Sequence, residues 1–161
     1  MNRLRVAWSE GKARVEAARS FQPGDELMIL EGEVAAQPTR YSVQVGAHEH
    51  LAPPAAVAAD PSADKVYLWR FLNHSCQPNA VVEGRRLMAI RAIAAGDEVA
   101  FDYHCTEYDM DAPFLCHCGH CGGVTVRGYR HLSAAQRQQL EPHVAPYLRK
   151  KLEAVALEAH A

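Results

Sequence analysis

Three cysteines that lie within six residues constrain this chain more than any other feature. The segment from Phe114 to Gly123 reads FLCHCGHCGG, and its glycines permit the tight backbone turns that converging side chains need. Thiols clustered beside glycine and histidine serve no packing purpose, but they suit a metal held by thiolates. A zinc site needs four ligands, so one more must come from elsewhere, and the candidates are Cys76, Cys105, His117 and His120.

The cysteine count also bears on the compartment. Five cysteines are an odd number, and the N-terminal residues MNRLRVAWSEGK are basic without a following apolar run, which argues against a secretory signal peptide. A disulfide framework is therefore disfavoured, and we expect a cytoplasmic protein. No apolar stretch approaches the roughly 20 residues of a membrane span.

Length and charge limit the function classes further. The chain has 161 residues, of which 48% are hydrophobic and 22% charged, as in one compact globular domain. Seventeen Lys and Arg against nineteen Asp and Glu give a net charge of −2. Direct nucleic-acid binding through a large basic surface is thus disfavoured.

The first hundred residues predict a mainly β fold, because short apolar and β-branched runs alternate with turn residues. Tyr41, Val43 and Val45 alternate with Ser42 and Gln44, and Glu83-Gly84 indicates a hairpin. Turns are indicated at 22–25 and 94–97, where glycine accepts positive φ. The expected strands are 4–8, 14–18, 26–30, 41–45, 80–82, 86–93 and 99–103.

Two further segments differ from this β pattern. Residues 46–64 are rich in alanine and proline, which predicts a loop insert rather than a second domain. Near the C-terminus, Ser133 and Gln136 form a capping-box pattern, and Pro146 suits the first turn of a helix that runs to about His160. That helix carries an apolar stripe, which either packs on the domain or mediates a dimer. The stripe consists of Leu148, Leu152, Val155 and Ala159.

Two motifs precede the cysteine cluster. Residues 70–79 read RFLNHSCQPN, and alone they indicate only a turn with a half-buried histidine. Residues 96–103 read GDEVAFDY, and alone they indicate a turn that leads into a core strand ending in tyrosine.

In this order, the three segments resemble the SET-domain protein lysine methyltransferases, and compact bacterial members with a post-SET zinc segment most of all. Arg19 to Glu26 and Glu31 to Glu33 add to the resemblance, which covers roughly residues 4–130. It implies small curved sheets around a pseudoknot, the β-clip of the SET fold. The implied divisions are a SET domain at 1–104 with the variable insert at 46–64, a post-SET zinc segment at 105–130, and C-terminal helices at 131–161.

The resemblance also implies a function and a set of site residues. The function is transfer of a methyl group from S-adenosylmethionine to a lysine amine of a protein or peptide, with Tyr103 as the catalytic residue. Cys76 becomes the fourth ligand of one structural Zn²⁺, which leaves Cys105 aside. The remaining implied residues are Asn73, His74, Lys12, Ala13, Arg14 and Phe114 for the cofactor, Phe101, Tyr41 and Tyr67 for the substrate channel, and Cys116, Cys118 and Cys121 for the metal.

The sequence departs from the family pattern at two places. The family's Gly-x-Gly loop is degraded to residues around Gly11-Lys12-Ala13, and the last two cysteines stand two residues closer than usual. The degraded loop keeps open a non-catalytic binding module with the SET fold. Methylation of a small amine or amino acid also stays open, because a chain of 161 residues has little room for a protein-docking surface. The acidic residues Glu107, Asp109 and Asp111 either attract basic peptides or form a solvated loop.

Overall fold

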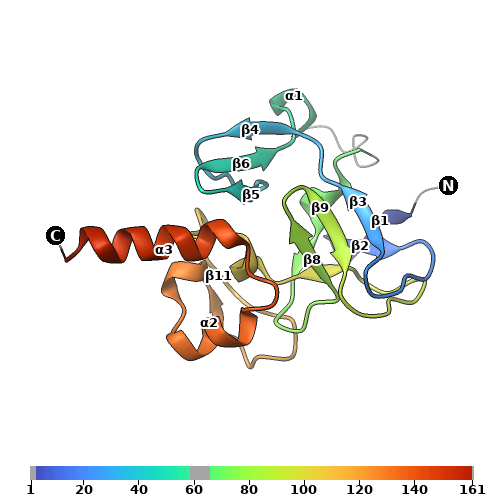
Figure 1. Ribbon diagram of the computed structural model, residues 1–161. Coiled ribbons are helices and arrows are strands. Elements are labelled where there is room, and N and C mark those ends of the chain that lie inside the picture. The colour runs from blue at the N-terminus through green and yellow to red at the C-terminus, as the bar shows by residue number, and fades with distance from the viewer. Residues whose placement is uncertain (1–2, 59–65, 161) are drawn as a thin grey trace.

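The chain forms several small β-sheets, and its two longest helices, α2 (Ala134–Leu140) and α3 (Pro146–Glu158), lie at the C-terminal end (Figure 1). The structure is a computed structural model that describes residues 3–58 and 66–160. Its first element is a hairpin of β1 (Leu4–Ser9) and β2 (Lys12–Ala17). Glu10 and Gly11 form the turn with φ values of 49° and 75°, the positive pair that a tight hairpin turn requires. The expected mainly β fold is confirmed.

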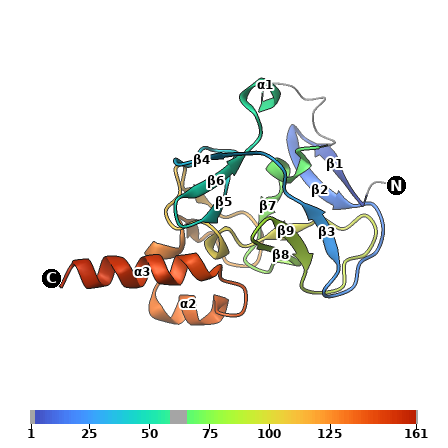
Figure 2. The same cartoon turned by 45° about the horizontal axis from the view of Figure 1, so that its top comes forward.

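Two antiparallel three-stranded sheets make up most of the body (Figures 1 and 2). In each sheet, the strand that comes last in the sequence is the central strand. The first sheet has the order β3 (Glu26–Ile29), β9 (Arg86–Ala89), β8 (Ala80–Glu83), and the second has the order β4 (Glu33–Ala35), β6 (Glu49–Ala52), β5 (Val43–Gly46). The expected hairpin at Glu83-Gly84 joins β8 to β9.

The expectation of a loop at 46–64 is wrong for its first part. Strand β6 is the central strand of its sheet, and the short helix α1 (Ala55–Ala58) follows it. Leu51 of β6 is fully buried and pairs with Val34 on one side and Val43 on the other. The alanine- and proline-rich composition that follows concealed this four-residue strand. Residues 59–64 of the insert lie outside the described residues.

The main core lies between the sheets and the 3₁₀ helix η2 (Leu68–Phe71). Trp69 of η2 is 1% exposed, and its indole nitrogen donates to the carbonyl of Glu31 at 3.0 Å. Both expected turns form, with Asp25 N donating to Gln22 O and Asp97 N to Ala94 O. The core thus supports the segment that leads directly into the Asn73-His74 motif.

A second, smaller core joins the C-terminal elements to the segment after Tyr103. Its buried members are Cys105, Tyr108, Tyr129, Val144, Ala145 and Leu148. The elements here are η3 (Tyr103–Cys105), β11 (Phe114–Leu115), β12 (Thr125–Val126), η4 (Tyr129–His131), α2 (Ala134–Leu140) and α3 (Pro146–Glu158). The capping box at Ser133 and Gln136 is present.

Helix α3 packs on the body only through its first half. Leu148 is fully buried, whereas Val155 and Leu157 are 45% and 74% exposed. The second half of α3 therefore projects from the body (Figures 1 and 2), and a dimer formed through it stays a prediction. In the part of the chain that the structure describes, every helix is too short or too polar to span a membrane.

Candidate active site and metal centre

The site begins where two of the sequence motifs pair. Strand β7 (Asn73–His74) runs parallel to β10 (Ala100–Phe101), with Asn73 opposite Ala100 and His74 opposite Phe101. The backbone amide of Ser75 extends the ladder by donating to Phe101 O at 3.1 Å. The expected strand at 99–103 is thus shorter than its pattern, because the 3₁₀ turn η3 already begins at Tyr103.

Asn79 clamps the same two motifs from the other end. Its side-chain amide donates to Glu98 O at 2.8 Å, and its side-chain carbonyl accepts from Ala100 N at 3.0 Å. A side chain that uses its donor and its acceptor on one neighbouring strand fixes the register of that strand. Both ends of the short parallel ladder are therefore anchored.

Tyr103 follows strand β10 closely in the sequence, and its ring lies among aromatic side chains. Ring centroids lie 4.9 Å away at Phe101, 5.4 Å at His74 and 5.8 Å at Phe114. The Tyr103 hydroxyl donates to the carbonyl of Leu72 at 2.5 Å. Burial raises the pKa of Tyr103 well above its ordinary value, so the phenol stays neutral and keeps its proton.

Asn73 links the ladder to the first hairpin. Its side-chain amide donates to Ala13 O at 3.2 Å and to Glu98 Oε1 at 2.7 Å, and the residue is exposed. Lys12 is also exposed, whereas the Arg14 guanidinium turns toward Glu16 at 2.7 Å. The residues expected at the cofactor from β2 and from β7 therefore lie side by side.

The side chain of His74 points inward and is 1% exposed. Its Nδ1 accepts from the Tyr103 amide at 3.2 Å, and its Nε2 lies 3.3 Å from Cys76 Sγ. Burial lowers the pKa of His74 to about 4, against the opposing pull of Asp102, so the imidazole is neutral. Only the main chain of His74 remains to face a bound molecule.

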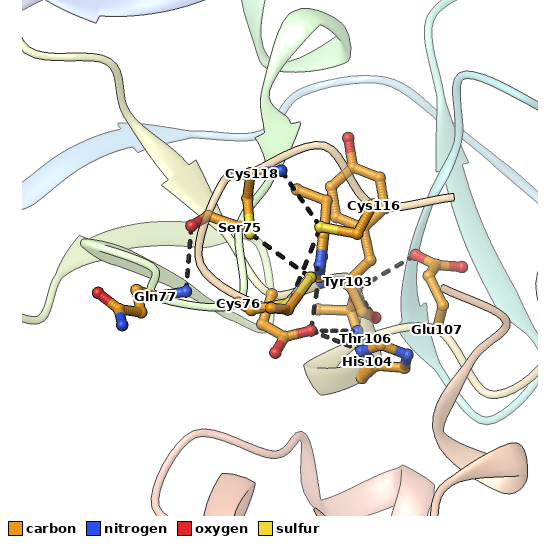
Figure 3. Close-up of polar contacts among 12 residues, drawn as sticks. Ser75, Cys76, Gln77, Tyr103, His104, Thr106, Glu107, Cys116 and Cys118 are labelled. Carbon is orange, nitrogen blue, oxygen red and sulfur yellow. Dashed lines mark hydrogen bonds and ion pairs between the residues drawn. The ribbon is translucent and has the colours of Figure 1, made fainter. Parts of the chain in front are cut away.

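Four cysteine sulfurs converge beside Tyr103 (Figure 3 shows Cys76, Cys116 and Cys118). The sulfurs of Cys76, Cys116, Cys118 and Cys121 all lie within 4.8 Å of one another. Cys76 and Cys116 are 3.8 Å apart, and Cys118 and Cys121 are 3.9 Å apart. Tetrahedral zinc with Zn–S bonds of about 2.3 Å separates its sulfurs by about 3.8 Å, so the geometry of the four thiols fits zinc.

The electrostatics of the four thiols divide them into two pairs. Burial raises the pKa of Cys76, and it raises that of Cys116 to about 11. Burial also opposes ionisation of Cys118, but the backbone N–H groups of Cys76 and His120 outweigh it and lower the pKa to about 6. Backbone N–H groups of Val124 and Gly123 lower the pKa of Cys121. Backbone N–H groups thus favour ionisation of Cys118 and Cys121, whereas burial opposes ionisation of Cys76 and Cys116.

A second group of possible metal ligands is explained by hydrogen bonds alone. His74, Asp102 and His104 are buried with ligand atoms within 4.8 Å of one another. Asp102 Oδ1, however, accepts from both the backbone amide and Nδ1 of His104 at 2.9 Å, and His74 Nδ1 accepts from Tyr103. The ligand atoms are occupied by these bonds, and Asp102 acts as the N-cap of η3.

The other expected site residues lie at varied distances from this centre. Phe114 is half-buried on β11 and touches the rings of both His74 and Tyr103. Tyr67 is half-buried against the main core, and Tyr41 is 46% exposed beside the Arg40 guanidinium. Cys105 lies apart from the four thiols, 3% exposed in the second core.

The residue patterns did not reveal a buried polar network behind Tyr103. Glu107 is 7% exposed, and its Oε1 accepts from Gln44 N at 2.8 Å and from Thr106 Oγ1 at 3.2 Å. Burial raises the pKa of Glu107 to about 7. The Tyr147 hydroxyl of α3 contacts the carbonyls of Gln44 at 2.6 Å and Thr106 at 3.0 Å.

Gln44 could not have been identified as part of this network from its strand pattern. The alternation at 41–45 indicates a strand with one polar face, yet Gln44 is 1% exposed. Its side chain is satisfied by Gly46 O and by Tyr108 N, both at 2.8 Å. No local signal marks such long-range partners.

A hollow of about 400 Å³ opens on the outer side of this network. Of the three acidic residues, Asp109 and Asp111 line it, but Glu107 is buried behind it. Asp109 is paired with Arg130 at 2.9 Å and with His131 at 2.8 Å. Other lining residues are Gln44, His48, His50, Tyr108, Met110 and Lys151.

Comparisons with known proteins agree with this arrangement. Residues 32–104 match the family model of the SET domain. The chain is 36% identical over 97 residues to "Methyltransferase flvH" of Aspergillus flavus, covering 55% of this chain and 54% of that protein. It is 33% identical over 122 residues to "Histone-lysine N-methyltransferase, H3 lysine-36 specific" of Chaetomium globosum, covering 67% of this chain and 14% of that protein.

Among solved structures, the fold is similar to "crystal structure of KRYPTONITE in complex with mCHG DNA and SAH", with a TM-score of 0.53 and 23% identity. That match covers 74% of this chain and 27% of the other. The chain therefore spans about half the length of one curated relative and a small part of the other. The family match, the β architecture and the fold shared with the solved structure agree on a SET domain at residues 32–104.

Proposed function

We propose that this chain is an S-adenosylmethionine-dependent protein-lysine N-methyltransferase. The observation that carries the proposal is the position of Tyr103, whose neutral hydroxyl is held by Leu72 O at the end of an aromatic enclosure. The names of the relatives, a methyltransferase and a histone-lysine N-methyltransferase, point to the same chemistry.

The cofactor side of the proposal rests on the surface formed by β2 and β7. A sulfonium nucleoside that carries an amino acid needs polar, charged and aromatic contacts. The exposed Asn73 amide, the main chain of His74 and Ala13, the Lys12 cation and the Phe114 ring offer these contacts. When bound, S-adenosylmethionine supplies an electrophilic methyl group on a positively charged sulfur.

The lysine side rests on Tyr103 and the rings around it. A lysine amine with an ordinary pKa near 10.4 is mostly protonated at neutral pH and has no lone pair to attack with. Desolvation among the aromatic side chains of Phe101, Tyr103 and Phe114 favours the neutral amine. The Tyr103 hydroxyl orients this amine, and the aromatic wall excludes water that would solvate it. Tyr67 and Tyr41 are weaker channel candidates.

The metal part of the proposal is one structural Zn²⁺ held by Cys76, Cys116, Cys118 and Cys121. Four thiolates leave no open position for substrate or water, so the ion holds the chain in place and takes no part in the reaction. Its effect is to tie the segment after Tyr103, including Phe114, to the Asn73-His74 motif. Metal analysis should give one zinc per chain, and Cys105→Ser should keep it.

The proposed substrate is a protein or peptide that presents lysine. Asp111 at the hollow favours basic residues that flank the target lysine, whereas Asp109 already pairs with Arg130 and His131. The expected lack of direct nucleic-acid binding stays a prediction, as does a cytoplasmic location. The structure of KRYPTONITE contains DNA, which makes a DNA-binding measurement on this chain worthwhile.

Incubation of the purified protein with cofactor labelled on its methyl group and with cell lysate tests the proposal. Labelled polypeptide supports it, and Tyr103→Phe should cut the labelling at least tenfold while calorimetry still detects cofactor binding. Label that appears only in small molecules supports methylation of a small amine or amino acid instead. Failure to bind the cofactor supports a non-catalytic module, for which Lys12 and Ala13 at the degraded glycine loop are the motivating observation.

A further inference from the structure

His74 stands between the two functional centres and touches both. Its imidazole lies between the backbone of Tyr103 and the sulfur of Cys76, at 3.2 Å and 3.3 Å. Among the described residues, this is the one side chain with a hydrogen-bond contact to both the proposed catalytic residue and a proposed metal ligand.

The first contact determines which nitrogen of the ring carries the proton. A backbone N–H can only donate, so Nδ1 of His74 must offer its lone pair to Tyr103 N. A doubly protonated ring has no such lone pair, and the ring is therefore neutral with its proton on Nε2. Asp102 does not compete for a proton on Nδ1, because its Oδ1 is 3.6 Å away, beyond hydrogen-bond distance, and already accepts from His104.

The second contact then has a defined direction. The Nε2–H group donates to Cys76 Sγ, which is the natural acceptor once the thiol is ionised by a metal. Hydrogen bonds to metal-bound sulfur withdraw electron density from it and change its strength as a ligand. The rings of Tyr103, Phe114 and His104 pack against the imidazole in T-shaped contacts, with centroids 5.4, 5.9 and 5.7 Å away, and restrict its rotation.

We propose that His74 is a positioning residue that couples the metal centre to Tyr103. Its Nδ1 accepts a hydrogen bond from the Tyr103 amide, and its Nε2–H donates a hydrogen bond to the Cys76 thiolate. The Tyr103 amide sets the tautomer of His74, and the ring thereby ties the position of Cys76 in the metal site to the backbone at Tyr103. The catalytic meaning of this coupling rests on the proposed function, whereas the hydrogen-bond relay itself does not.

Two conservative substitutions separate the two halves of the relay. In His74→Asn, the side-chain oxygen takes the place of Nδ1 and can still accept from Tyr103, but nothing reaches Cys76. In His74→Gln, the amide reaches the position of Nε2 and can still donate to Cys76, but Tyr103 loses its acceptor. His117→Asn is the matched control, because His117 is exposed although it stands between two of the cysteines.

The first measurement uses the wild-type protein and needs no variant to fold. In the zinc-loaded protein, nitrogen-15 NMR should report His74 as the neutral Nε2–H tautomer. An Nδ1–H tautomer or a doubly protonated ring would overturn the proposal outright.

The second measurement reads the metal. In the Co²⁺-substituted protein, His74→Asn should move the thiolate-to-metal charge-transfer band to longer wavelength and weaken zinc binding in chelator competition by about 10–100-fold. His74→Gln and His117→Asn should stay within about threefold of the wild-type zinc affinity. An unchanged band and affinity in His74→Asn would refute the link to Cys76.

The third measurement reads Tyr103. His74→Gln should shift the amide proton resonance of Tyr103 and lower kcat with little change in KM, and His74→Asn should largely preserve that resonance. An unmoved resonance in His74→Gln would refute the link to Tyr103. A protein that passes the NMR and cobalt tests but methylates nothing would refute the proposed function and leave the relay standing.

Discussion

The buried carboxyl of Glu107 makes the stability of this protein depend on pH in a way that one substitution should remove. Burial raises the pKa of Glu107 from the ordinary 4.5 to about 7. The folded state therefore binds this proton more tightly than the unfolded state, and stability that is complete below pH 4.5 is lost as the pH rises through 7.

The size of the effect follows from the two pKa values. Each tenfold difference in proton affinity is worth about 1.4 kcal/mol, so a pKa of about 7 against 4.5 corresponds to about 3 kcal/mol. Most of this loss, roughly 2.5 kcal/mol, falls between pH 5 and pH 8 by the same linkage relation. Glu107→Gln removes the titration but keeps an oxygen that can accept from Gln44 N and Thr106 Oγ1.

Urea unfolding at several pH values between 5 and 8 measures the difference between the two proteins. The free energy of unfolding of the wild type should fall relative to Glu107→Gln by about 2–3 kcal/mol across this range. Glu153→Gln, which changes an exposed residue of α3, is the matched control and should follow the wild type. Parallel curves for the wild type and Glu107→Gln would refute the reasoning, because the carboxyl would then titrate alike in both states.

Three other perturbations test the packing of the C-terminal elements and the metal centre. Tyr147→Phe leaves the carbonyls of Gln44 and Thr106 without their donor and should cost about 1–3 kcal/mol, or roughly 3–8 °C in calorimetric Tm; an unchanged Tm would show that α3 is not held by this hydroxyl. Leu148→Ala opens a cavity at a fully buried position and should cost about 2–5 kcal/mol in urea unfolding, with Leu157→Ala as the neutral exposed control. Metal removal by a chelator should abolish hydrogen-exchange protection at β11 and β12 first, while β8 and β9 stay protected; simultaneous loss everywhere would contradict a local structural role for the ion.

The local patterns were sufficient for elements whose stability comes from nearby residues. The hairpin at Glu83-Gly84, the turns at 22–25 and 94–97, and the Ser133 capping box all form as expected. Each depends on backbone conformations and hydrogen bonds within a few residues, which turn and capping residues determine directly.

The features that were missed depend on contacts between distant parts of the chain. Strand β6 exists because Leu51 is paired on both sides, and Gln44 is buried because Tyr108, Glu107 and Tyr147 satisfy its polar groups. A short strand or a polar residue gives no local sign of such partners. The convergence of Cys76 with the other thiols was likewise open on spacing alone, and only the resemblance to a family selected it.

The parallel ladder of β7 and β10 also has a kinetic consequence. It joins residues 73–74 to residues 100–101, and the cluster of four thiols brings Cys76 together with residues as far along the chain as Cys121. Such non-local pairings lose the entropy of closing a long loop before their contacts can stabilise the structure, so they form late and slowly. During synthesis, the Asn73-His74 segment leaves the ribosome well before its partners and must wait for them. The protein should therefore bring Tyr103 and the four thiols together as one of the last steps of folding, and binding of the proposed metal would complete that step.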